Sequence, residues 1–151
     1  MPSNQAKDPI ASYRLICGAI TAMPLIYMVL AVAIKRAGVI PETGVGNFDP
    51  AATMPISLAL VAAGTVASVA SIAIKKLVLR TVDVQAQDAA ARFKATLVSM
   101  AISESGAVIG LTLMLLTGDL LYGGLLCGLS FAVTCFHFPS RYWLEQGNAI
   151  V

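Results

Sequence analysis

Four apolar runs, each about long enough to cross a bilayer as a helix, constrain the fold of this chain most. A hydrocarbon core of about 30 Å needs roughly 20 apolar residues in a helix. The runs cover residues 13–34, 54–74, 95–117 and 120–138. Only 12% of the 151 residues are charged and the mean hydropathy is +0.82, whereas soluble domains average about 25% charged residues. We therefore expect an all-α polytopic membrane protein, with residues 1–151 forming a single four-helix transmembrane domain.

The segments between the runs indicate how the helices connect. The first run is longer than the apolar part of a cleavable signal peptide, so we expect it to be retained as a true span. Residues 37–53 are rich in Gly and Pro and indicate a structured turn outside the bilayer. The segment "DVQAQDAAARFKA" has helix-forming composition and should extend the third helix into water. The short link "TGDLLYGG" predicts that the third and fourth runs form an antiparallel hairpin.

The distribution of cations predicts the orientation. With four spans, the two termini and the second loop lie on one side of the membrane, and that side carries eight cations, whereas the other side carries Lys35 and Arg36. The eight are Lys7, Arg14, Lys75, Lys76, Arg80, Arg92, Lys94 and Arg141. The positive-inside rule then places both termini in the cytoplasm. We expect a multi-pass protein of the cell (inner) membrane, arranged as two antiparallel hairpins; a weak similarity between "AITAMPLIY" and "AISESGAVI" suggests that the hairpins are tandem repeats.

Composition argues against nucleic-acid binding and against special roles for the cysteines. The cations cluster near the ends of the runs and do not alternate with aromatic residues, so we expect no nucleic-acid binding. The three cysteines, Cys17, Cys127 and Cys135, lie inside apolar runs without CxxC spacing. They are most simply buried packing residues, and we expect neither a metal site nor a disulfide.

Small residues spaced by four predict where helices approach one another closely. Such spacing gives a flat helix face, and close packing is a main source of helix association in lipid. The predicted packing residues are Gly64 and Ser68 in the second run, Gly106 and Gly110 in the third, and Gly124 and Gly128 in the fourth.

The third run contains one carboxylate, Glu104, near its centre. A charge at that depth costs from a few to more than ten kcal/mol, depending on how the penalty is obtained. Three arrangements would avoid the cost: a protonated side chain, a paired cation or ion, or a position facing a cavity. No Lys or Arg lies at comparable depth, and Arg14 and His137 lie near the ends of their runs. The sequence therefore favours a protonated or ion-occupied Glu104.

The stretch "MAISESGAVIGLTLMLL" around Glu104 resembles the carboxylate-bearing helix of the rotor proteolipid, the c subunit, of rotary ATP synthases. The resemblance covers one helix and part of the loop before it, roughly a quarter of the chain. It implies that Glu104 binds the transported proton or sodium ion and that the Ser105 hydroxyl helps coordinate it. Ile109 stands where sodium-driven members have a tyrosine that closes the ion site, and the second run offers no Gln or Glu as a further ligand. A proton is therefore the expected ion, and no other cofactor is expected.

Two other classes of function remain open. In the first, the chain is a non-catalytic subunit of a larger membrane complex, such as a respiratory complex, and a protonated Glu104 bonds to Ser57, Thr65, Ser68 or a backbone carbonyl. In the second, the chain is a membrane-embedded enzyme, which would need converging polar groups. The candidates Thr112, Ser130, Thr134 and His137 look scattered in the sequence, with His137 expected at the membrane interface and Asp119 expected to cap the fourth helix. The expected partners are the lipid bilayer and either further copies of the chain or other membrane subunits.

Overall fold

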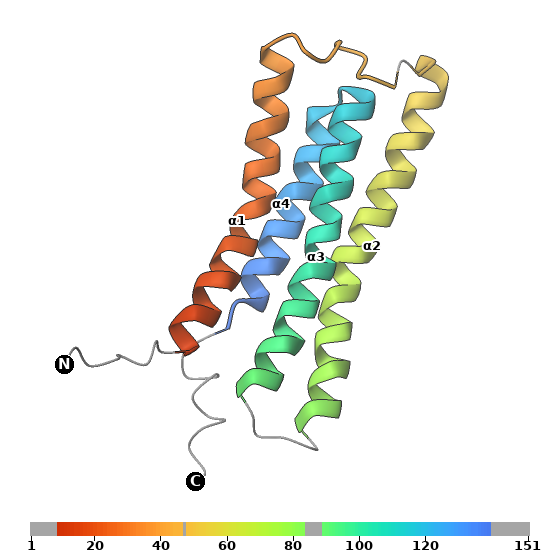
Figure 1. Ribbon diagram of the computed structural model, residues 1–151. Helices are drawn as coiled ribbons and strands as arrows, with labels where there is room; N and C mark the ends of the chain where they lie inside the picture. Colours follow the sequence, from red (N-terminus) through yellow and green to blue (C-terminus); the bar gives the residue numbers. More distant parts are fainter. Residues whose placement is uncertain (1–8, 47, 84–88, 140–151) are drawn as a thin grey trace, which may run out of the picture.

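The chain folds into four antiparallel helices in the computed structural model, which describes residues 9–46, 48–83 and 89–139 (Figure 1). The helices are α1 (Pro9–Arg36), α2 (Pro50–Asp83), α3 (Ala89–Thr117) and α4 (Leu120–His137). Each is long and apolar enough to cross a membrane. The prediction of an all-α chain with four spanning helices is confirmed, and these helices indicate a multi-pass membrane protein.

The bundle has two ends that differ in structure. At one end, which we call the His137 end, α1 and α3 begin and α2 and α4 finish (Figure 1). At the other, the Asp119 end, α1 runs into the loop that leads to α2, and α3 turns into α4. Helix α3 begins at Ala89, six residues before its predicted span, so residues 89–94 of the preceding segment extend the helix as predicted, whereas residues 84–88 of that segment lie outside the described part of the chain. Helix α2 is also longer than its apolar run and continues to Asp83.

Helix α3 lies at the centre of the packing. It contacts α2, α4 and α1, whereas α1 packs on α3 and α4 and hardly touches α2. Figure 1 shows α1 and α2 on opposite sides of the α3–α4 pair. Helices α3 and α4 pack against each other, whereas α1 and α2 follow each other along the chain without packing as a pair.

The α3–α4 turn is built by a glycine and a capping carboxylate. Gly118 has φ +71°, a left-handed conformation that favours glycine. Asp119 then accepts hydrogen bonds through Oδ1 from the backbone N–H groups of Leu121 (2.9 Å) and Tyr122 (3.1 Å). These bonds satisfy two of the first free donors of α4, as an N-cap should. The prediction that Asp119 caps the fourth helix is confirmed.

Two pairs of small residues let α3 approach its neighbours closely. A Cβ added to Gly106 would collide with the Ser68 hydroxyl and lie 2.9 Å from the Gly64 carbonyl oxygen of α2. A Cβ added to Gly110 would lie 2.8 Å from the carbonyl oxygen of Gly123 in α4. The small residues predicted in α2 and α3 therefore lie at helix contacts.

The two packing residues predicted in α4 are placed differently. A Cβ added to Gly124 or Gly128 meets nothing within 4 Å, so neither residue packs against a helix of the described chain. Gly123, one position earlier, makes the contact with α3 instead. One residue corresponds to about 100° of rotation in a helix, so Gly123 faces α3 while Gly124 does not.

Candidate functional site

Glu104 lies on α3 about halfway between its ends and is half-buried. Its Oε1 accepts a hydrogen bond from the Tyr27 hydroxyl of α1, over 3.1 Å. Within the described part of the chain this is its only side-chain partner, and neither Lys nor Arg forms an ion pair with it. None of the three hydroxyl residues proposed as partners, Ser57, Thr65 and Ser68, is bonded to it. The sequence offered no signal for Tyr27, because the partner depends on how α1 is rotated against α3.

Ser105 does not face the same way as Glu104. It is exposed, and its hydroxyl donates to the backbone carbonyl of Ile102 over 2.6 Å. Lone hydroxyls in helices often bond to a carbonyl of the preceding turn in this way. In this arrangement the hydroxyl beside the Glu104 carboxylate is that of Tyr27, and Ser105 faces outward.

Hydroxyl side chains join α3 to α4 at the same depth. Ser103 donates to the Ser130 carbonyl (3.3 Å), and Ser130 donates to the Ser103 carbonyl (2.6 Å). Thr134 adds a bond to the Ser103 hydroxyl (3.2 Å). All three side chains are fully buried. Interhelical bonds of this kind average about 0.6 kcal/mol in membrane bundles and reach about 1.7 kcal/mol.

The sequence predicts an interfacial His137, whose side chain would lie on the surface of the bundle. In the structure this side chain is fully buried. His137 is the last residue of α4, but its ring points inward, and Nε2 lies 3.0 Å from the Ser71 hydroxyl of α2. Lys75 donates to the His137 backbone carbonyl over 3.2 Å, a favourable position for a cation at a helix C-terminus. Ser130, Thr134 and His137 are therefore all buried, the first two bonded to Ser103 of α3 and His137 bonded to Ser71 of α2. Thr112 is exposed and lies apart from them.

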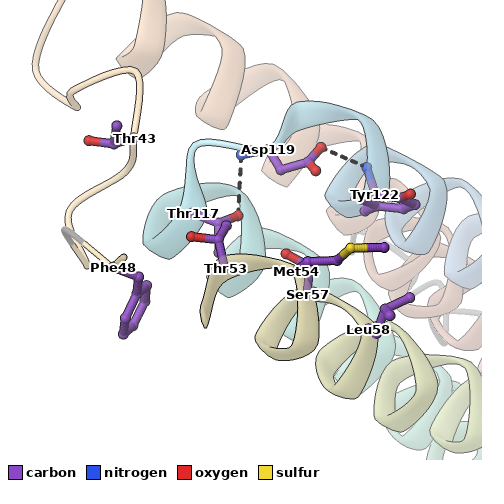
Figure 2. A pocket seen from close by; sticks show the side chains of 9 residues that line it. All are labelled: Thr43, Phe48, Thr53, Met54, Ser57, Leu58, Thr117, Asp119 and Tyr122. Carbon is purple, nitrogen blue, oxygen red and sulfur yellow. Dashed lines mark hydrogen bonds between the residues drawn. The ribbon is translucent and has the colours of Figure 1, made fainter. Parts of the chain in front are cut away.

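A pocket of about 470 Å³ opens at the Asp119 end of the bundle (Figure 2). Its walls come from the loop before α2, the first turns of α2 and the α3–α4 turn. The lining residues are Thr43, Phe48, Thr53, Met54, Ser57, Leu58, Thr117, Asp119 and Tyr122. The one carboxylate among them, Asp119, already serves as the cap of α4. This pocket contains neither Glu104 nor the buried hydroxyl network.

No family model, curated protein or solved structure matches the chain. The described residues also contain no group of three or more His, Cys, Asp or Glu side chains placed to hold a metal ion. The polar and ionisable groups that the described residues place inside the bundle are one carboxyl, one imidazole, several hydroxyls and the buried thiols of Cys17 and Cys127. Such groups can exchange and pass protons.

Proposed function

We propose that this chain is an integral membrane subunit in which Glu104 binds and releases a proton within the bilayer. The observation that carries the proposal is the position of Glu104, near the middle of a spanning helix with only the Tyr27 hydroxyl as a described partner. An ionised carboxylate there would lack a counter-charge, so the neutral, protonated form is favoured at rest. Loss of the proton then requires a cation or water at the carboxyl.

The Tyr27–Glu104 pair supports the likeness to rotor proteolipids in one respect. In the resemblance, a tyrosine closes the ion site from within the carboxylate-bearing helix, and Ile109 stands at that position here. Tyr27 offers a phenol from α1 instead, 3.1 Å from the carboxylate. A single hydroxyl and an outward-facing Ser105 supply few ligands for sodium, which prefers several oxygens, so we propose a proton as the ion.

The membrane and orientation form part of the same proposal. The His137 end carries Lys75, Lys76, Arg80, Arg92 and Lys94, whereas the Asp119 end carries Lys35 and Arg36. By the positive-inside rule we place the His137 end in the cytoplasm and the chain in the cell membrane.

Carbodiimide labelling tests the proposal, because carbodiimides react with protonated carboxyls inside membranes. We expect Glu104 to be modified in bilayers and the modification to fall as pH rises. Glu104→Gln should abolish the labelling while the protein still folds, and Glu42→Gln, a change in an exposed loop carboxylate, should leave it intact. Labelling that is absent at every pH, or that persists in Glu104→Gln, would overturn the proposal.

The size of the assembly separates a rotor from an accessory subunit. Native mass spectrometry in mild detergent should give a closed ring of identical copies if the chain works as a rotor proteolipid. A single copy held among unrelated chains would instead support the accessory reading, with Glu104 protonated and bonded to Tyr27 for packing alone.

A further inference from the structure

Fully buried polar side chains line the contact between α2, α3 and α4, from the His137 end to the middle of the bundle. None of them exposes any of its surface to solvent. They are Ser68, Ser71, Thr96, Ser99, Ser103, Ser130, Thr134 and His137. The interior of a membrane bundle needs no polar side chains for packing, and each one must find a hydrogen-bond partner to avoid a penalty. We refer to these eight residues as the polar column.

The register of α3 and α4 places two members of the column at the same level. Ser103 and Ser130 exchange hydrogen bonds, so they lie opposite each other in the antiparallel pair. Seven residues make about two turns of a helix. Two turns back along α3 is Thr96, and two turns forward along α4 is His137. These two residues therefore face each other at the His137 end of the column.

Three buried atoms in the column have no partner within the described chain. They are the Ser68 hydroxyl, the Thr96 hydroxyl and His137 Nδ1. The other ring nitrogen of His137 is bonded to Ser71, whose hydroxyl also donates to the Ser68 carbonyl over 2.6 Å. Buried polar atoms are almost always bonded to protein or to ordered water. Three unpartnered atoms on facing helices are the setting in which internal water is found.

We propose that the polar column holds internal water at Thr96 and His137 and forms the path by which protons reach the middle of α3. The path begins at the His137 end, continues through Ser71 and the hydroxyls of the α3–α4 contact, and ends at Ser103. Ser103 lies at the level of Glu104 on α3, about 100° around the helix from it, because it bonds to α4 while Glu104 bonds to Tyr27 of α1. The destination of the path rests on the proposed function of Glu104, whereas the water site does not.

Thr96→Val tests the water site by the sign of its effect. The two side chains have the same shape and the same branching at Cβ, so helix propensity hardly changes. If water bonds to the Thr96 hydroxyl, the substitution removes that bond and lowers the midpoint of thermal unfolding. If the hydroxyl is truly unbonded, its removal raises the midpoint. The matched control is Thr112→Val, because the Thr112 hydroxyl bonds to its own helix on an exposed face and its loss should hardly change the midpoint.

Deuterium exchange at the Glu104 carboxyl tests the path. Stopped-flow infrared spectroscopy after transfer into D₂O follows the exchange in bilayers, and Thr96→Val should slow it severalfold relative to Thr112→Val. His137→Gln, which keeps a polar side chain, should slow it less than His137→Phe. A raised unfolding midpoint in Thr96→Val would overturn the water site. Unchanged exchange rates in all these variants would overturn the path while leaving Glu104 as a proton site, and a Glu104 carboxyl that never exchanges in the unmodified protein would overturn both.

Discussion

Helix α1 and the group formed by α2, α3 and α4 hold their polar side chains in two different ways. In the three-helix group, hydroxyls and an imidazole are fully buried and bonded across tight helix contacts. On the α1 side, Tyr27 and Glu104 form the side-chain hydrogen bond to another span that the described residues show, and both residues are only half-buried. Just 17% of the α1 span is buried inside the bundle, against 44% for α3.

This difference distinguishes the tightly packed helices α2, α3 and α4, which form a scaffold, from the looser α1–α3 contact, which holds the candidate site. Close packing at Gly106 and Gly110 and the Ser103–Ser130 bonds fix the positions of α2, α3 and α4. The contact of α1 with α3 is less extensive, so the bond to Glu104 can open at small cost. A carboxyl that must exchange a proton fits the looser contact better than the tight one. The following predictions test this contrast, from the largest expected effect to the smallest.

Gly106→Ala should have the largest effect, because it disrupts the close packing of α3 against α2. Its Cβ would collide with the Ser68 hydroxyl and crowd the Gly64 carbonyl, and overpacking of this kind costs about 1–3 kcal/mol. We expect a lower unfolding midpoint in detergent. Gly128→Ala is the control, since its Cβ meets nothing within 4 Å. Equal effects of the two substitutions would show that α2 and α3 are not in close contact at Gly106.

Asp119→Ala should weaken the α3–α4 hairpin by removing the cap of α4. The loss of a capping side chain costs about 0.5–2 kcal/mol. Asp119→Asn retains a capping oxygen and should remain close to the unmodified protein. Reversible unfolding in detergent measures both, and a destabilised Asn variant would mean that the charge of Asp119, rather than its hydrogen bonds, stabilises the hairpin.

Ser130→Ala should cost about 0.6–1.7 kcal/mol, because it removes a buried bond between α3 and α4. The matched control is Ser105→Ala, which removes an exposed hydroxyl that bonds only within its own helix. Unfolding measurements on the two variants compare a buried with an exposed serine. A neutral Ser130→Ala would mean that the hydroxyl network does not hold α4 on α3.

Tyr27→Phe should have the smallest effect on stability, about 0.6 kcal/mol or less, because it removes one bond at the looser contact. It should nevertheless change the rate of carbodiimide labelling of Glu104, since the carboxyl loses its described partner. The control is Tyr122→Phe, at an exposed position on α4. A large loss of stability without a change in labelling would show that Tyr27 is a packing residue. The α1–α3 contact would then not differ from the tight contacts among α2, α3 and α4.

The sequence predicted the four helices well, because run length and hydropathy depend on the bilayer and not on tertiary contacts. It also predicted the cap at Asp119, which is set by local chemistry. It did not predict which side chains meet across helices. Glu104 bonds to Tyr27 rather than to a serine or threonine of α2, and His137 points inward although it ends a helix. Both depend on helix rotation, which apolar runs with weak amphipathic character leave undefined.

The most direct test of the central claim is the protonation state of Glu104 in a bilayer. Difference infrared spectroscopy between the unmodified protein and Glu104→Gln isolates the carboxyl stretch of this residue. We predict a protonated carboxyl band at neutral pH that shifts on deuteration and disappears reversibly as pH rises. A difference spectrum that shows an ionised carboxylate throughout, or a protonated carboxyl that no change of pH removes, would contradict a proton-exchanging Glu104.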